Sequence, residues 1–380
     1  MSRLGLALFT ISILLCLIGI FIIYESSTYS ALLSIGDKYY FVKNQAIWFV
    51  IGIVGCLIIS KINYKLYYKL ALPALLFSLA LLVLVFFPGI GLSLKGAHRW
   101  LNFGFVVMQP SEILKITLTI YLAAWLSVKE KGKFVAFILL LSLSVFLVIA
   151  EPDMGTAVII AATSTIVYFL SGAPIRDMVL IFMLFAVGVF GLIVFEPYRL
   201  ARLTAYQNVD AKNLSTTSYH VKQILVALGS GGMTGVGFGK SIQKYAYLPE
   251  STTDSIFAIF GEEAGFIGST ILIGIFLLAV FVGFGIAANA PDTFGKLLGA
   301  GIITFLAIQT FVNIASQVVL IPLTGVPLPF ISYGGSSLII NLAAVGVLMN
   351  IARGEKHAFK IARFNKSSKI AMVHRKGKSR

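Results

Sequence analysis

The chain has 380 residues, of which 58% are hydrophobic and 12% are charged, and its net charge is +15. Soluble domains carry about twice this share of charged residues, so the chain lacks the polar side chains needed to cover a globule. A soluble enzyme and a disordered protein are therefore excluded. The composition indicates a polytopic membrane protein, and the hydropathy pattern below makes it an all-α one.

Hydropathy predicts about ten transmembrane helices. They lie near residues 4–24, 46–60, 70–87, 111–127, 135–150, 155–171, 178–195, 255–285, 297–320 and 336–352. The first run is long for a signal peptide, and no small-residue cleavage site follows it, so we expect it to be retained as a helix. An even number of spans places both termini on the same side of the membrane.

The charges of the short loops orient these helices. Lysines cluster in two predicted turns, at 61–69 and 129–133, on the side that also holds both termini. Residues 353–380 form a basic tail near anionic lipid, and we expect no nucleic-acid partner for it. The positive-inside rule therefore places both termini in the cytoplasm and leaves residues 1–352 as one membrane domain.

The outer loop before the fourth span contains the sequence Lys95-Gly-Ala-His-Arg-Trp100. Trp100 beside Arg99 suits an anchor at the membrane interface. Alternatively, Arg99 binds a phosphate group. His98 is expected to be exposed and inert.

Glu112 and Lys115 open the fourth span, three residues apart on one helix face, where they can form an ion pair. Pro110 fits the first helical turn just before them. Charge at membrane depth marks a functional site by default. The pair is interpreted either as a structural salt bridge or as part of a polar cavity, and the two readings are compatible.

The turn between the fifth and sixth spans has two carboxylates, Glu151 and Asp153, on either side of Pro152. One interpretation is a tight turn in which Asp153 caps the next helix. The other is a polar wall or a cation site below the outer face.

The segment at about 196–254 is the longest predicted loop and lies outside the membrane. It is polar and Gly-rich, and it contains Arg202, Lys240 and Lys244; loops of this length are usually functional or disordered. Its stretch at 229–241 looks like a phosphate-binding loop but lacks the glycine spacing of a Walker or dinucleotide motif. The glycines still allow backbone N–H groups to approach an anion.

The long loop ends in Leu248-Pro-Glu-Ser-Thr-Thr-Asp254, directly before the eighth span. Thr253 or Asp254 could simply cap that helix. A carboxylate at the outer rim is also where a general base would sit. Further on, three prolines at 322–329 precede Ser332-Tyr-Gly-Gly-Ser-Ser337, and such broken backbone is tolerated at membrane depth only where it is buried or lines a cavity.

Taken together, the chain resembles the SEDS family (shape, elongation, division and sporulation) of bacterial membrane glycosyltransferases. The resemblance rests on the stretches KGAHRWLNFG, QPSEILK, EPDMGT, LTAYQN, QKYAYLPE and PLPFISYGGSSL, in that order. The first outer loop, GDKYYFVKNQAIW, is most similar to the division members of the family, whereas TGVPLPFISYGG leans toward the elongation members. We therefore favour a division member.

The resemblance implies a ten-helix fold and an activity, the polymerisation of lipid II into glycan strands at the outer leaflet. The catalytic aspartate of the family matches Asp254, which would act as general base. The cavity-lining pair of the family matches Glu112 and Lys115, and the acid of the EPDxGT motif matches Asp153. This chain departs from the family pattern around the base, with Thr252 where a His is frequent and Ser255 where a Phe is frequent.

Chain growth needs a base for a sugar hydroxyl and positive charge for the leaving pyrophosphate. Glu250 is the second candidate for the base. The cations suited to the pyrophosphate are Arg99, Arg202, Lys240 and Lys244, alone or with a divalent Mg or Mn ion. The expected partners are lipid II, a class B penicillin-binding protein and other division-complex membrane proteins, in the bacterial cytoplasmic membrane at the division septum.

Two other functions are consistent with the same residues. A lipid II flippase would depend on the buried Glu112, Lys115 and Asp153 more than on Asp254, although transporters often show internal repeats, which we do not find here. A scaffold that recruits a transpeptidase would keep its function after Asp254→Ala.

Overall fold

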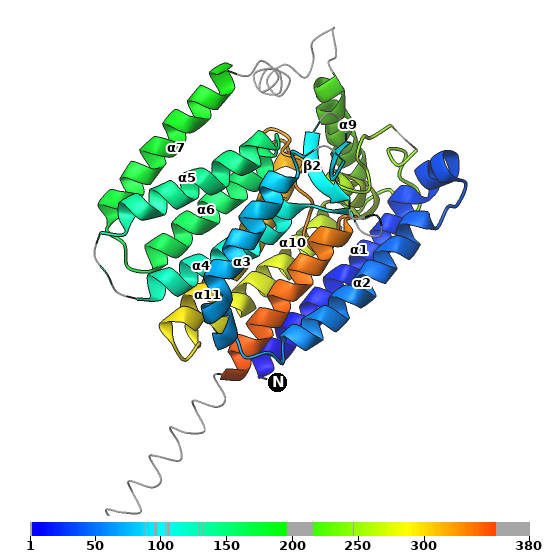
Figure 1. Cartoon of the computed structure of the whole chain (residues 1–380). Coiled ribbons are helices and arrows are strands. Elements are labelled where there is room, and N and C mark those ends of the chain that lie inside the picture. Colours follow the sequence, from blue (N-terminus) through cyan, green and yellow to red (C-terminus); the bar gives the residue numbers. More distant parts are fainter. Residues whose placement is uncertain are drawn as a thin grey trace, which may run out of the picture.

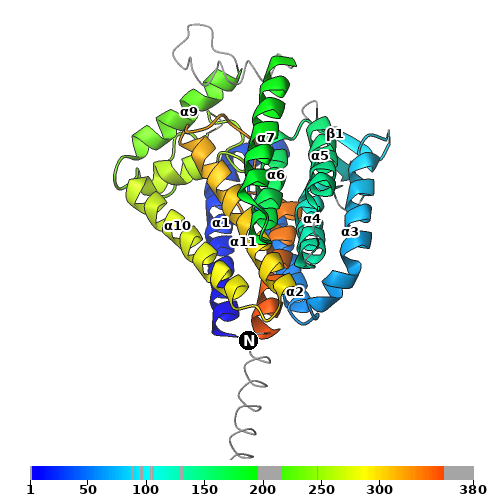
Figure 2. The ribbon, with the colours of Figure 1, turned by 90° about the vertical axis from the view of Figure 1, so that its left-hand side faces the viewer.

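We describe the fold from a computed structural model, which covers residues 2–354 apart from 88, 95–96, 103, 105–106, 129, 131, 196–215 and 246. Arg202 and the tail at 355–380 lie outside the described residues. Within the described part, long helices run side by side through the molecule (Figures 1 and 2).

The helices follow the predicted order of spans. They are α1 (Arg3–Ile35), α2 (Tyr40–Ile59), α3 (Lys65–Leu84), α4 (Pro110–Ser127), α5 (Phe134–Ala150), α6 (Met154–Leu170), α7 (Ile175–Phe195), α9 (Thr216–Gly231), α10 (Ile256–Ala288), α11 (Thr293–Gln317) and a last helix, Gly335–Gly354. Each of the ten predicted spans overlaps one of these helices. Among the described helices, α1, α2, α3, α10, α11 and the last are long and apolar enough to cross a membrane, and α5 and α6 are shorter apolar helices. The count of ten crossings stays a prediction.

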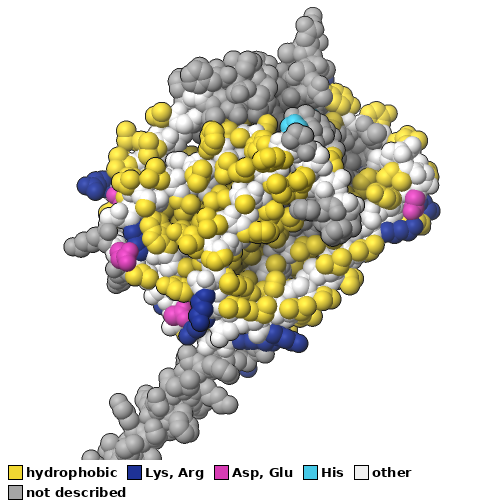
Figure 3. All heavy atoms as spheres, in the orientation of Figure 1, with side chains coloured by type: hydrophobic (Ala, Val, Ile, Leu, Met, Phe, Trp, Pro, Cys, Tyr) yellow, Lys and Arg dark blue, Asp and Glu magenta, His cyan; other side chains and the backbone are white. Residues whose placement is uncertain are grey.

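The surface is that of a multi-pass membrane protein. Figure 3 shows hydrophobic side chains over most of one face, with Lys and Arg gathered mainly toward its lower edge and its sides. Large apolar side chains such as Phe182 and Phe281 are more than two-thirds exposed, at 75% and 78%. A surface of this kind needs lipid around it, because water would not solvate it.

Both ends of the described chain lie at the same end of the helix bundle (Figures 1 and 2). A Cβ added to Gly5 would lie 3.3 Å from the Cβ of Ala352, which puts the start of α1 against the last helix. This agrees with an even number of membrane crossings. The cytoplasmic side of this end stays a prediction.

The first helix is longer than hydropathy predicts, because it continues through Glu25 to Ile35. Glu25 forms an ion pair with Lys244, at 3.2 Å. Ser26 and Ser27 are buried, and α1 ends only at Gly36, whose φ of 82° is the left-handed conformation that terminates many helices.

The loop between α3 and α4 folds into a small antiparallel sheet, which the sequence did not lead us to expect. Its strands are β1 (Gly91–Leu94), β2 (Ala97–Asn102) and β3 (Val107–Met108), in the order β1-β2-β3. Leu92 pairs with Trp100 and Leu101 with Met108. Trp100 and Arg99 are therefore held on a strand rather than in a flexible loop.

In its described part, from residue 216 on, the predicted long loop contains α9 and a turn-rich segment that folds back onto α10. This segment meets α10 at Gly265, where φ is 67° and the helix is interrupted. A Cβ on Gly265 would overlap the backbone nitrogen of Gly235. Only glycine fits this crossing, since the conformation is left-handed and the space is filled by backbone.

The central helix of the molecule is α11. Most of its residues are buried, and it packs against α4, α6 and α10. Its polar side chains therefore face other helices and not lipid, and they reach the candidate site.

Candidate active site

Asp254 lies in the turn that leads into α10, and it is partly buried. The N-cap position of α10 belongs to Ser255, so the prediction that Thr253 or Asp254 caps this helix is wrong. Gly325 approaches the Asp254 carboxylate from the Pro-rich segment, since a Cβ on Gly325 would lie 3.4 Å from Asp254 Oδ2. The carboxylate is thus held between the start of α10 and the backbone at Gly325.

Three hydrogen bonds fix the backbone of this turn. Asn313 Nδ2 on α11 donates to the carbonyl oxygen of Asp254, at 3.0 Å. Ser332 Oγ donates to the carbonyl oxygen of Thr253 at 2.7 Å, and the backbone N–H of Tyr333 donates to that of Thr252 at 2.9 Å. Of the broken backbone after Pro322, Val326 and the residues from Leu328 to Ser332 are buried, whereas Gly325 is exposed. The segment supports the turn that carries Asp254.

Glu250, the second candidate base, lies at the start of the same turn. Its backbone has a φ of 53°, and its carbonyl oxygen accepts hydrogen bonds from the N–H groups of Thr253 and Ser255. Its carboxylate accepts a hydrogen bond from Thr253 Oγ1, at 2.9 Å. Glu250 thus shapes the turn through both its backbone and its side chain.

Glu112 and Lys115 form the predicted ion pair on α4, with 2.8 Å between Lys115 Nζ and Glu112 Oε1. Their side chains are only 3% and 1% exposed. Lys115 Nζ also donates to Gln309 Oε1 on α11, at 2.7 Å. Glu112 Oε2 is buried and has no hydrogen-bond partner among the described residues, so this site keeps one unused carboxylate acceptor.

Asp153 caps α6, as one of the two interpretations predicted. Its Oδ1 accepts a hydrogen bond from the N–H of Thr156 at 3.1 Å, and its Oδ2 accepts one from Gln109 Nε2 at 2.9 Å. Two residues later, Gly155 allows α6 to pack directly on the Pro-rich segment, because a Cβ there would lie 2.9 Å from the carbonyl oxygen of Thr324. The start of α6 and the turn of Asp254 therefore flank the same segment.

Arg99 reaches across from β2 to the turn between α5 and α6. Its Nε donates to the carbonyl oxygen of Glu151 at 3.0 Å, and its Nη2 donates to that of Pro152. Glu151 is fully buried, and burial raises the pKa of its carboxyl group to about 9, with a further contribution from Asp153 that Arg99 partly offsets. This turn is thus a buried structural element fixed by Arg99.

The Gly-rich stretch at 229–241 does bind an anion through its backbone, but the anion is the protein's own. Glu262 and Glu263 of α10 are buried beneath it. The N–H groups of Gly239 and Ile242 donate to Glu263 Oε1 and Glu262 Oε1, each at 3.1 Å. These carboxyl groups thus accept from amides at the end of the stretch, whereas the N–H groups of Gly235 and Gly237 donate to backbone carbonyl oxygens.

The two candidate lysines of this region differ. Lys244 is buried and forms ion pairs with Glu25 at 3.2 Å and with Glu263 at 3.3 Å. Lys240 is exposed. Lys244 thus joins α1 to α10, whereas Lys240 presents its charge at the surface.

Three functional candidates were missed in the sequence. Gln309 and Asn313 are fully buried amides on α11, and His220 of α9 lies with Nε2 at 2.7 Å from Ser255 Oγ. The sequence did contain a signal for the two amides, because Gln309 and Asn313 are polar residues four positions apart within an apolar span. His220 had none, because nothing local connects it to a residue 35 positions away.

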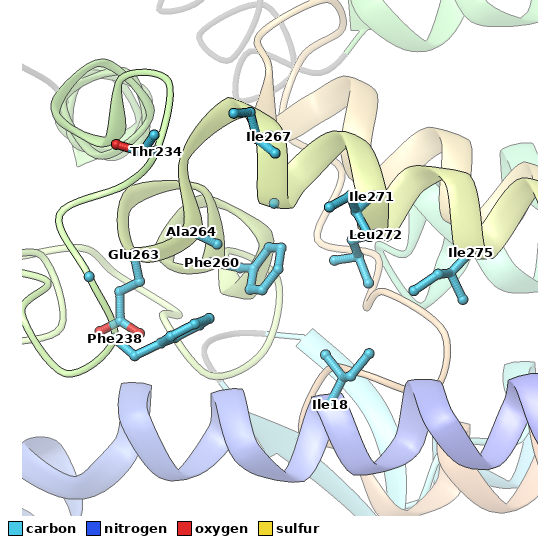
Figure 4. A pocket seen from close by; sticks show the side chains of 12 residues that line it. Ile18, Thr234, Phe238, Phe260, Glu263, Ala264, Ile267, Ile271, Leu272 and Ile275 are labelled. Atoms are coloured by element: carbon cyan, nitrogen blue, oxygen red, sulfur yellow. The ribbon is translucent and has the colours of Figure 1, made fainter.

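An apolar cavity of about 490 Å³ lies between α1, the loop after α9 and the kinked part of α10. Figure 4 shows Ile18, Phe260 and Ile271 around it, with Glu263 at its polar end. None of the candidate site residues named from the sequence lines it. The cavity therefore does not belong to the site around Asp254.

The described residues contain no group of three or more His, Cys, Asp or Glu side chains placed to hold a metal ion. We therefore assign no residue to a divalent metal. The requirement for Mg or Mn stays a prediction.

Comparison with known proteins places these features in a family. A family model for cell cycle proteins of the FtsW, RodA and SpoVE type matches residues 6–357. The chain is 37% identical to stage V sporulation protein E of Bacillus subtilis (strain 168), over 93% of this chain and 98% of that protein. It is 38% identical to a protein of Trichlorobacter lovleyi named "Probable peptidoglycan glycosyltransferase FtsW", over 94% of this chain and 95% of that one.

Solved structures share the fold. One, described as "Structural coordination of polymerization and crosslinking by a peptidoglycan synthase complex", aligns with a TM-score of 0.76 at 25% identity, over 92% of this chain and 97% of that chain. The crystal structure of the rod shape determining protein RodA of Thermus thermophilus aligns with a TM-score of 0.67 at 25% identity, over 92% and 96% of the two chains.

Proposed function

This chain belongs to the FtsW, RodA and SpoVE family of cell cycle proteins, and on that premise we propose that it is a peptidoglycan glycosyltransferase that polymerises lipid II. The structural observation that best supports the proposal is the turn at Asp254. The backbone that carries this partly buried carboxylate is held there by hydrogen bonds from α11 and from the segment after Pro322 to the carbonyl oxygens of Asp254 and Thr253. A base must be fixed in this way to meet a substrate hydroxyl.

In the proposed reaction, the carboxylate of Asp254 accepts the proton of a sugar hydroxyl on one lipid-linked chain. The hydroxyl oxygen bonds to the anomeric carbon of a second chain, and the bond from that carbon to pyrophosphate breaks. The products are a longer glycan, a protonated Asp254 and a free polyprenyl pyrophosphate. The lipid tails stay in the bilayer, which suits a site at the end of membrane helices.

The buried pair Glu112–Lys115 and the capping Asp153 would support substrate binding on the same side of the Pro-rich segment. The leaving pyrophosphate needs positive charge. Of the cations predicted from the sequence, Lys240 is exposed, Lys244 is engaged by two glutamates, and Arg99 is engaged by two carbonyl groups. We therefore propose Lys240 as the first candidate among the described cations.

We further propose that the protein acts in cell division, at the septum, together with a class B penicillin-binding protein. The curated relatives named FtsW support the division role. The structure described as a synthase complex for polymerization and crosslinking supports a crosslinking partner.

The test is glycan-strand synthesis from lipid II by the purified protein, alone and with its cognate transpeptidase. Native protein is compared with Asp254→Asn and with Asp37→Asn, a matched control whose carboxylate pairs with Lys43 at 2.8 Å in the loop after α1. We expect polymer from the native protein and the control, and about 100- to 10,000-fold less from Asp254→Asn. Chelation followed by Mg or Mn addition tests the metal in the same assay.

Equal polymer from all three proteins would move the base elsewhere, and Glu250→Gln would then be tested. If no protein makes polymer with partner and metal supplied, the glycosyltransferase assignment fails. Translocation of lipid II across liposome membranes would then be measured for Lys115→Met and Asp254→Asn. This comparison would distinguish a flippase from a scaffold.

A further inference from the structure

Two amide side chains of α11, Gln309 and Asn313, are fully buried in the centre of the helix bundle. They are four residues apart, so they lie on one face of the helix, one turn from each other. A buried amide is costly unless its polar atoms are hydrogen-bonded. The partners of these two therefore show what the amides do.

Gln309 connects α4 with the Pro-rich segment. Its Oε1 accepts a hydrogen bond from Lys115 Nζ at 2.7 Å, and its Nε2 donates to the carbonyl oxygen of Pro327 at 3.0 Å. One side chain thus binds the buried ion pair at one end and the backbone of the segment at the other.

Asn313 connects the same segment with the candidate base. Its Nδ2 donates to the carbonyl oxygen of Val326 at 2.8 Å and to that of Asp254 at 3.0 Å. Val326 and Pro327 are consecutive, so the two amides bind adjacent peptide units. Gly325, which directly precedes Val326, is the residue that packs against the Asp254 carboxylate.

We propose that Gln309 and Asn313 are positioning residues, which join the Glu112–Lys115 pair to Asp254 through the backbone at 325–327. This inference rests on the proposed function. The amides touch no reacting atom. They hold Asp254 and the backbone at 325–327 at a fixed distance from the Glu112–Lys115 pair. A substrate that reaches from Asp254 to the pair therefore binds in one geometry.

The test uses variants that separate the two hydrogen bonds of Gln309. Gln309→Glu keeps an acceptor for Lys115 but loses the donor to Pro327, and Gln309→Leu loses both. Asn313→Leu removes both bonds of Asn313. The matched control is Thr304→Val, also on α11, whose hydroxyl is buried and has no hydrogen-bond partner among the described residues.

We expect Gln309→Glu, Gln309→Leu and Asn313→Leu to lower kcat by about ten- to a hundredfold with little change in KM, because a misplaced base slows the chemical step. Thr304→Val should match the native protein. Lys115→Met and Asn313→Leu should combine to less than the product of their separate effects, because both would break the same link.

Hydrogen–deuterium exchange gives a readout that does not need activity. If the link exists, Gln309→Glu and Lys115→Met should both speed exchange of the amides at 252–255, while Thr304→Val should not. Full activity and native exchange in Gln309→Glu would overturn the proposal even if the native protein polymerises lipid II. Faster exchange without any polymer from the native protein would instead overturn the proposed function, and with it the positioning role.

Discussion

His220 Nε2 and Ser255 Oγ lie 2.7 Å apart, so α9 contacts the residue that directly follows Asp254. Ser255 is fully buried and holds the N-cap position of α10. The helix α9, which lies in the predicted long loop, is therefore part of the support of the candidate active site.

We expect His220→Ala to lower the rate of polymerisation by up to about tenfold, the effect of losing one hydrogen bond. The initial rate with lipid II measures it. His98→Ala, at an exposed histidine of β2, is the control and should keep the native rate. Equal rates for the two variants would show that the contact to Ser255 does not support catalysis.

Breaking the buried ion pair should destabilise the protein strongly. Lys115→Met leaves the Glu112 charge without its partner, and we expect a loss of about 3–5 kcal/mol in the free energy of unfolding. The double variant Glu112→Gln/Lys115→Met should lose less than the sum of the two single losses, because no unpaired charge remains. Denaturant unfolding in detergent checks this, and additive losses would contradict it.

Glu151 should make stability depend on pH. Its pKa is raised from 4.5 to about 9 by burial, so the folded state holds the proton more tightly than the unfolded state. The associated stability is complete below the unfolded pKa and is lost as the pH rises toward the folded pKa. Melting temperatures measured from about pH 5 to pH 9 should fall for the native protein more than for Glu151→Gln. Parallel curves would exclude Glu151 as the cause.

Gly265→Ala should give little folded protein, because the side chain would overlap the backbone of Gly235 at a left-handed position. Gly274→Ala is the control on the same helix, and nothing lies within 4 Å of its added Cβ. We expect that variant to be as stable as the native protein, or more stable by up to about 1 kcal/mol. Fluorescence-detected gel filtration compares the yields, and equal yields would contradict the close crossing.

Substitutions of the two lysines of the Gly-rich region should affect different properties: protein stability for Lys244 and substrate binding for Lys240. Lys244→Met leaves Glu25 and Glu263 without their cation and should cost about 3–5 kcal/mol of unfolding free energy. Lys240→Met should change stability by less than about 0.5 kcal/mol while raising KM for lipid II. A native KM for Lys240→Met would remove it from the pyrophosphate site.

Local sequence patterns were sufficient to predict a large part of the fold of this protein. Each predicted span overlaps a helix, because a run of apolar residues long enough to cross a bilayer is a property of the sequence itself. The cap at Asp153 and the ion pair Glu112–Lys115 were also predictable, since both join residues three positions apart. The ordered motifs were sufficient to identify the family.

The tertiary structure alone decided which distant groups meet. Gln309 binds Lys115 across 194 positions and Lys244 binds Glu25 across 219, and no local spacing encodes such contacts. The Gly-rich stretch offered its amides to any anion, and packing against α10 gave them to Glu262 and Glu263. The sequence thus determined the helices and the family, because hydrophobic length and short-range pairing are local. The surroundings of Asp254 depended on which buried polar groups of separate helices form hydrogen bonds with one another.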